Sequence, residues 1–293
     1  MKFELRQHKE LPGIPSASGL EITDSGIFII GDDSPYLFKL NSQFEIIEKI
    51  QLFPEKQFPG NIIEKLKKPD LEALARGNTE ANILYAFGSG SKSPERDLMV
   101  KIDLSAKISS TYSLVHFYSH LRTLTGITAE QLNIEAAEIY QEQLLLFNRG
   151  ENMIIKLSLR GFLAHLKDGG EIPELEIFRI DLPNINGIPA GFSGASLDPD
   201  NGILFFTATV ENTDNWIDDG EVMGSFIGTI KLLDLRDGMK PDHVAILVDK
   251  DHLKIKVESI AVLAPFKKEK ADLVLITDSD GGVSEILSGI LYY

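Results

Sequence analysis

Short apolar runs recur along the whole chain, and turn residues separate them. The first group reads SGLEIT, IFIIGDDS, YLFKLN and EIIEKIQLF, and the later groups repeat this order. β-Branched and aromatic residues fill the runs, and Gly, Pro, Asn and Asp bound them, which is typical of short β-strands. The pattern therefore predicts an all-β chain built from similar segments.

One polar position recurs inside the first run of each segment. In KPDLEALA, Glu72 stands between Leu71 and Ala73, so a strand must point it away from its apolar neighbours. Four glutamates and one serine mark this position: Glu21, Glu72, Glu135, Ser196 and Glu258. They lie 51, 63, 61 and 62 residues apart, and five segments of similar length account for the chain.

Four antiparallel strands, repeated radially, describe the blades of a β-propeller. We therefore predict a five-bladed β-propeller with four-stranded blades, in one domain over residues 1–293. The fifth segment contains only three strands, and the N-terminal run KFELRQ has no place in the first blade. We expect this run to supply the outer strand of the last blade, which closes the ring and covers an exposed edge.

Two other architectures are alternatives to the five-bladed propeller. A β-sandwich would not produce a period of about 60 residues. A sixth blade stays open if SLVHFYSHLRTLTGITAEQL conceals one, although this stretch is better interpreted as a linker with a short helix. NIIEKLKK and RGFLAHLKDG are predicted to be helical excursions between blades.

Composition narrows the classes of partner. The chain has 44 acidic and 29 basic residues and a net charge of −15, which opposes nucleic acids and anionic membranes and attracts cations. No run approaches the ~20 apolar residues of a membrane-spanning helix, and no secretory signal is visible. We expect a cytoplasmic protein, unless a signal has been removed. The oligomeric state stays open.

The recurrent glutamates suggest a cation site. In a propeller the first strand of each blade lines the central channel, so Glu21, Glu72, Glu135 and Glu258 are predicted to converge there. Like charges at close range raise each other's pKa, and a bound cation relieves this strain. Ca²⁺ suits such oxygen ligands, whereas the absence of cysteine makes zinc a poor fit. The alternative is that the glutamates only hydrogen-bond to backbone amides of neighbouring blades.

A second set of polar residues follows the second strand of each segment. Because that strand runs antiparallel to the first, its end should lie at the mouth where the first strands begin. Loops at such a mouth commonly bind ligands. The predicted ligand-binding residues are Asp32, Asp33, Ser89, Ser91, Arg149, Glu211, Asn212, Asp278 and Asp280. Arg149 is a base in this acidic rim, and it would either orient an anionic group or pair with a rim acid.

The insertion ENTDNWIDDGEVMGS contains the only tryptophan, Trp216. It follows the fourth rim cluster and would either fold over the mouth or pack against the blade edge. Asp218, Asp219 and Glu221 are further candidate cation ligands, or else a solvated acidic turn.

These segments resemble those of an uncharacterised bacterial β-propeller family. The resemblance rests on SGLEITDSGIFIIGDDSPYLFKLN, KPDLEALA with FGSGS, LNIEAAEI with FNRGEN, FSGASLDPDNGILFFTATVENT with DDGEVMGSFIG, and KVESIAVL with LITDSD. That family is similar to the SdiA-regulated, phytase-like and esterase-like propellers. The SdiA-regulated relatives imply five blades and calcium on Glu21, Glu72, Glu135 and Glu258, with Ser196 departing from the pattern. The phytase-like relatives imply phosphoester hydrolysis, but no matching residue set is found here.

Three functions follow in order of preference. The first is a binding protein with Ca²⁺ in the channel and a small polar or anionic ligand at its mouth. The second is a metal-assisted phosphoester or ester hydrolase, in which Glu211 or a rim aspartate activates water. The third is a protein-interaction platform. Nucleophile-elbow and P-loop motifs are absent, and the six histidines fall outside the repeat positions.

Overall fold

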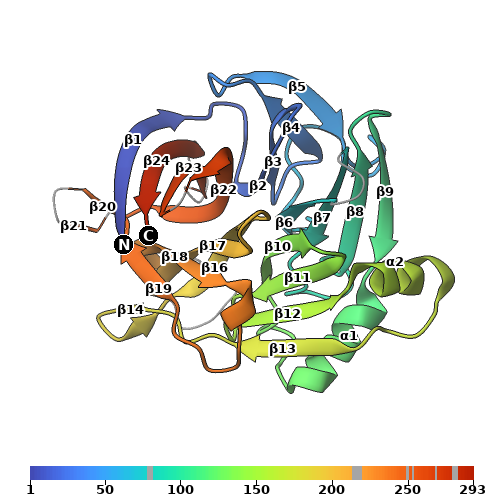
Figure 1. Ribbon diagram of the computed structural model, residues 1–293. Coiled ribbons are helices and arrows are strands. Elements are labelled where there is room, and N and C mark those ends of the chain that lie inside the picture. The colour runs from blue at the N-terminus through green and yellow to red at the C-terminus, as the bar shows by residue number, and fades with distance from the viewer. Residues whose placement is uncertain (78–81, 213–219, 249–250, 253, 268, 279–282) are drawn as a thin grey trace.

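The computed structural model describes residues 1–77, 82–212, 220–248, 251–252, 254–267, 269–278 and 283–293. Five antiparallel four-stranded sheets are arranged as blades around a central axis (Figure 1). The innermost strands β2, β6, β10, β16 and β22 each contact the innermost strands of the two neighbouring blades. The five-bladed, all-β prediction is confirmed.

Four blades are continuous in sequence. Blade 1 contains β2 (Ala17–Thr23), β3 (Gly26–Gly31), β4 (Tyr36–Leu40) and β5 (Ile46–Gln51). Blade 2 contains β6 (Leu71–Arg76), β7 (Ile83–Gly88), β8 (Leu98–Asp103) and β9 (Ile108–Ser113). Blade 3 contains β10 (Ile134–Tyr140), β11 (Gln143–Asn148), β12 (Met153–Ser158) and β13 (Leu175–Arg179). Blade 4 contains β16 (Gly191–Asp198), β17 (Ile203–Asn212), β18 (Glu221–Lys231) and β19 (Asp242–Ala245).

The two ends of the chain meet in blade 5. Its strands β22 (Lys256–Lys267), β23 (Lys270–Asp278) and β24 (Glu285–Tyr292) come from the C-terminal segment. The outer strand is β1 (Lys2–Glu10), which pairs antiparallel with β24 from Lys2 opposite Tyr292 to Glu10 opposite Glu285. The predicted closure by the N-terminal strand is confirmed, and Figure 1 shows the two termini side by side.

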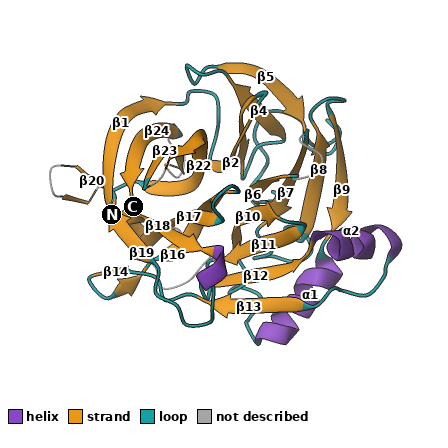
Figure 2. Cartoon of the chain, in the orientation of Figure 1, coloured by secondary structure: helices purple, strands orange, loops and turns teal. Residues whose placement is uncertain are grey.

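The connections contain a few smaller elements (Figure 2). Helix α1 (Val115–Thr125) links blades 2 and 3, as the sequence predicted, so no sixth blade is hidden there. Helix α2 (Leu159–Asp168) lies within blade 3, between β12 and β13, and not between blades as predicted. The stretch NIIEKLKK forms turns and not the predicted helix.

The sequence did not reveal four two-residue strands and one short helix. These are β14 (Asn184–Ile185), β15 (Ile188–Pro189), β20 (Leu247–Val248), β21 (Asp251–His252) and the 3₁₀ helix η1 (Leu232–Asp234). The four strands form two hairpins, β14 with β15 and β20 with β21. Both hairpins lie outside the blades.

The hydrophobic core is divided into five clusters, one between each pair of neighbouring blades. The cluster between blades 2 and 3 is extended by α1 and α2, where Phe117 packs edge-on against Phe162 at 5.0 Å. Apolar side chains on both faces of each blade are buried in this way. The free edges of the innermost strands, with their polar side chains, therefore line the central axis.

Candidate functional site at the channel mouth

A β-bulge lies near the start of every innermost strand. The pairing with the second strand shifts by one residue there, which leaves Ser18, Glu72, Glu135, Ser193 and Glu258 as the extra residues of the five blades. A bulge re-aims the extra side chain out of the regular ladder. Three of the four predicted glutamates, Glu72, Glu135 and Glu258, therefore occupy equivalent positions.

The other two repeat residues are not at the bulge. Glu21 and Ser196 lie three residues beyond it, and the true equivalents are Ser18 and Ser193. Ser196 Oγ accepts a hydrogen bond of 3.1 Å from Val262 N in the next blade. Glu21 accepts one of 3.0 Å from Ile22 N and another from the backbone of Arg76 in the next blade. At these two positions the side chains therefore accept hydrogen bonds from backbone amides, which is the alternative to metal binding that the sequence also suggested.

A sequence signal for the correct register was present. The bulge residue is followed by a small residue in all five blades: Gly19, Ala73, Ala136, Gly194 and Ser259. In blade 4 the neighbouring blade leaves little room for a larger side chain at this position. A Cβ on Gly194 would lie 2.6 Å from Thr207 Oγ1 and 2.7 Å from Ser259 Cα. Aligning the segments on these small residues, and not on the glutamates, would have identified Ser18 and Ser193.

The rim residues lie beside the starts of the innermost strands. The backbone N–H groups of Asp32, Ser89 and Arg149 donate to the residues that precede β2, β6 and β10, over 3.0, 2.9 and 2.8 Å. In blade 5, Asp278 pairs with Lys256, the first residue of β22. Bulge glutamates and rim residues therefore surround the same mouth of the channel.

Two residues at this mouth adopt a left-handed backbone conformation. Ser16 and Asp70, which directly precede β2 and β6, have φ values of 42° and 55°. Residues other than glycine rarely adopt this left-handed conformation, and such residues often cluster at functional sites.

A small cavity of about 40 Å³ opens at the mouth. This volume suits one water molecule or one ion. The lining residues are Ser16, Ala17, Ser18, Asp32, Glu72, Glu135, Lys256, Glu258 and Asp278. Asp32 Oδ1 and the neighbouring Asp33 Oδ1 are buried and accept no hydrogen bond in the part of the chain that the structure describes. A buried acceptor without a donor is costly, which favours an additional occupant.

The acids do not form the single predicted four-residue set. Among the described residues, one group of three has carboxylate oxygens within 4.8 Å of one another, and it consists of Asp32, Asp70 and Glu72. Asp70 was not among the predicted residues. Glu135 and Glu258 line the cavity together with Asp32 and Glu72, whereas Asp70 and Glu21 do not line it.

Basic residues hold one side of this group. Lys68 Nζ contacts Asp32 and lies 2.8 Å from Asp70 Oδ1, and its side chain is 13% exposed. Burial opposes the charged form of Lys68, but the carboxylates of Asp70 and Asp32 outweigh it and raise its pKa. Arg96 Nη1 lies 2.6 Å from Asp70 Oδ2, and the predicted residues Ser89 and Ser91 bond to Asp70 and Arg96 over 2.5 and 2.7 Å.

The opposite side of the mouth is a second charge network. The buried Arg149 lies 3.1 Å from Glu211 Oε2 and 3.8 Å from Glu135 Oε1. Lys256 Nζ lies 3.0 Å from Glu258 Oε1 and 3.5 Å from Glu211 Oε1. Arg149 thus pairs with rim acids, which was the alternative to its role as an anion receptor. Asn212 lies at the end of β17, opposite Glu221.

The neighbouring basic groups only partly balance the burial of the cavity carboxyls, whose pKa values are raised. Burial, the largest cause, raises the pKa of Glu135 to about 8 and that of Asp32 to about 6. Burial and the charge of Asp70 raise the pKa of Glu72 well above its ordinary value, and burial also raises the pKa of Glu258. A cation in the cavity would favour the ionised forms and reverse these shifts.

Glu138 lies three residues beyond the bulge of blade 3 and is 8% exposed. It forms no hydrogen bond or ion pair in the described chain, and burial followed by the charge of Glu21 raises its pKa well above normal. The folded state therefore retains a proton that the unfolded state loses, so stability falls as pH rises above about 4.5.

We expect Glu138→Gln to match the wild type near pH 4 and to be more stable at pH 8, by about 1.4 kcal/mol for each unit of pKa shift. Urea unfolding at both pH values measures this, with the exposed Glu142→Gln as control. A destabilised variant at pH 8 would contradict the assignment of Glu138 as an unpaired buried carboxyl.

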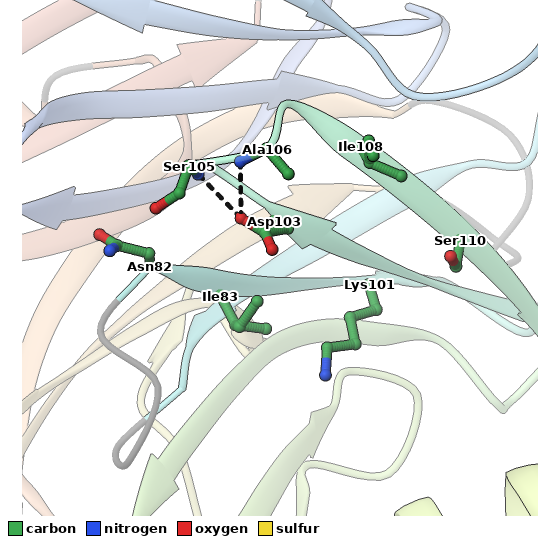
Figure 3. A pocket seen from close by; sticks show the side chains of 8 residues that line it. All are labelled: Asn82, Ile83, Lys101, Asp103, Ser105, Ala106, Ile108 and Ser110. Atoms are coloured by element: carbon green, nitrogen blue, oxygen red, sulfur yellow. Dashed lines mark hydrogen bonds between the residues drawn. The ribbon is translucent and has the colours of Figure 1, made fainter.

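Other predicted features lie elsewhere. Asp280, Trp216, Asp218 and Asp219 fall outside the described residues. Glu221 is exposed and pairs with Lys254 at 3.0 Å, away from the cavity. A larger hollow of about 520 Å³ lies on blade 2, between the start of β7 and the turn after β8 (Figure 3). Its Asp103 accepts hydrogen bonds from the backbone of Ser105 and Ala106, so this carboxylate stabilises the turn.

The fold has distant relatives among solved structures. Glutaminyl cyclase from Myxococcus xanthus superimposes with a TM-score of 0.54 at 11% identity, covering 99% of this chain and 97% of that one. A tail fibre of a Staphylococcus aureus phage gives 0.51 at 13% identity, covering all of this chain and 53% of that one. At such identities the likeness concerns the propeller fold alone.

Three further findings concern the chain. No helix among the described residues is long and apolar enough to cross a membrane. No curated protein matches the sequence. A family model does match it, over residues 13–291, and the chain therefore belongs to the family of unknown function DUF6929.

Proposed function

We propose that this propeller binds a divalent cation of the calcium class in the cavity at its channel mouth. The observation that carries the proposal is the cavity itself, which is sized for one ion and bordered by the buried Asp32 Oδ1 without a donor. Five carboxylates line it against a single base, Lys256. A cation supplies the missing positive charge at the lowest cost, because it satisfies several carboxylates at once.

Asp32 and Glu72 would be the primary ligands, with Glu135, Glu258 or Asp278 contributing from the far side. Ser16 and Ser18 offer hydroxyl oxygens at the same wall. Ca²⁺ accepts six to eight oxygen ligands in flexible geometry, which suits carboxylates delivered by irregular bulges of separate blades. Mg²⁺ demands near-ideal octahedral geometry, which such a set does not provide.

A small polar or anionic ligand would then be held by the cation at the open side of the cavity. Arg149 adds little to such binding, because Glu135 and Glu211 already occupy its guanidinium. The ligand's class follows from the cation, since an oxygen-bearing anion completes its coordination.

The test compares thermal unfolding of metal-stripped protein with and without millimolar Ca²⁺, in the wild type, Glu72→Gln and Glu21→Gln. Calcium should stabilise the wild type, by about 2.7 kcal/mol at a hundredfold excess over Kd. Glu72→Gln should lose most of this response, although without calcium it should be at least as stable as the wild type. Glu21→Gln, outside the cavity, should keep the response. Failure of calcium to shift the wild type would refute the proposal.

The two alternative functions have less support. A hydrolase would need the same cation as its electrophile, so the cation test comes first. An interaction platform is not favoured by any particular surface among the described residues. The cation proposal rests on the residues of the cavity and not on a resemblance to SdiA-regulated or phytase-like propellers.

A further inference from the structure

Two of the proposed ligands, Asp32 and Glu72, also belong to the three-carboxylate group with Asp70 at the edge of the cavity. That group already holds a positive group, the ammonium of Lys68. Its Nζ contacts Asp32 and lies 2.8 Å from Asp70 Oδ1, and the charge of Glu72 also acts on it. These three carboxylates are the group whose oxygens lie within 4.8 Å of one another. Lys68 therefore stands where a metal ion bound by this group would stand.

Two cations cannot share that position. Like charges at such a short separation repel strongly in a partly buried site. The hydrogen bonds of Lys68 also occupy Asp32 Oδ2 and Asp70 Oδ1, and they leave Asp32 Oδ1 as the open oxygen of that carboxylate. Binding in the group must therefore displace the ammonium.

The surroundings permit this displacement. Asp70 Oδ2 is bound separately, by Arg96 at 2.6 Å and Ser89 Oγ at 2.5 Å, so the carboxylate keeps its position when Lys68 leaves. The Lys68 side chain retains 13% exposure and a flexible stem, and so it has a route to solvent. Asp32 keeps its backbone bond to Ser16, which fixes the second ligand.

We propose that Lys68 is a tethered competitor which occupies the cation site in the empty protein, and that binding exchanges its ammonium for a divalent ion. This inference rests on the proposed function and adds a selectivity mechanism to it. A monovalent cation gains nothing electrostatically by replacing Lys68, whereas a divalent cation adds one net charge to the acidic group. Lys68 thereby sets both the affinity and the charge class of the ion.

Titration calorimetry with Ca²⁺ tests the energetic half of the proposal. Lys68→Met should bind Ca²⁺ at least about tenfold more tightly than the wild type, since the competitor is gone. Lys92→Met should bind as the wild type does, because Lys92 is an exposed lysine of the neighbouring loop that lies 3.9 Å from Glu95 and donates to Leu66 O over 3.3 Å, and contacts none of the three carboxylates. Binding to Lys68→Met that equals or falls below the wild type would overturn the proposal.

Amine labelling of the wild type tests the displacement itself and needs no variant. Acetic anhydride followed by peptide mass spectrometry should find Lys68 protected without metal and labelled several-fold faster in saturating Ca²⁺. If calcium binds and Lys68 stays protected, the exchange is refuted while the cation site stands. If Ca²⁺ binds neither the wild type nor Lys68→Met, the proposed function and the exchange both fail. Binding by Lys68→Met alone would also refute the exchange, because the ammonium would then block the site and not be displaced by the ion.

Discussion

Replacing Arg149 by methionine is expected to lower the free energy of unfolding by about 3–5 kcal/mol at neutral pH, because it leaves buried carboxylates without their cation. Arg149 is 6% exposed and pairs with Glu135 and Glu211 from blades 3 and 4. Methionine retains the aliphatic stem that packs against Gly191, so the loss is mainly that of charge. Urea unfolding of the wild type and the variant measures the difference.

The cost of this substitution should depend on pH. Burial already raises the pKa of Glu135 to about 8, and loss of Arg149 would raise it further. Ionisation of Glu135 then penalises the folded state as pH rises above the pKa of this carboxyl in the unfolded chain, and the cost should shrink as pH falls toward 5. The exposed Arg160→Met serves as the control. A small, pH-independent effect for Arg149→Met would show that the network at the mouth is not energetically coupled.

Removal of residues 1–10 is expected to destabilise the protein by several kcal/mol, on the order of 5 kcal/mol, and to promote self-association. The deletion removes β1, whose Phe3 and Leu5 pack on the cluster between blades 4 and 5. It also exposes the edge of β24, whose Ile286, Leu287 and Leu291 are buried. An unpaired apolar edge strand is a template for pairing with another chain.

Thermal unfolding and size-exclusion chromatography measure the two effects. The peptide KFELRQHKE added in trans should restore part of the stability by strand addition, whereas the reversed sequence should not. A truncated protein that stays monomeric with an unchanged midpoint would contradict the role of β1 as the closing strand.

The architecture could be predicted from the sequence because its signal is local and repeated. Each blade carries its own strands and turns, so the period and the incomplete fifth segment together specify five blades and their closure by KFELRQ. The rim could also be placed, since the end of a second strand must adjoin the start of the first. Asp32 and Asp278 line the cavity as this argument predicts, and Arg149 lies 3.8 Å from Glu135, another residue of the cavity wall.

The alternation of apolar and polar residues did not reveal the register of the bulge, which the pairing of the strands established. Glu21 and Glu72 look equivalent along the chain, yet the one-residue shift in each ladder places Ser18, and not Glu21, beside Glu72 at the mouth. A period-two pattern cannot reveal such an insertion, because the extra residue disturbs the alternation by only one position.

By itself, the sequence determined the five-bladed fold, its closure and the acidic mouth, because these depend on patterns within single segments. Only the tertiary structure decided which charges meet there. Lys68 reaches Asp32 across 36 residues, and Arg149 reaches Glu211 across a blade boundary. Such pairs carry no periodic signal, since burial and distance, and not spacing along the chain, determine which buried charge compensates another.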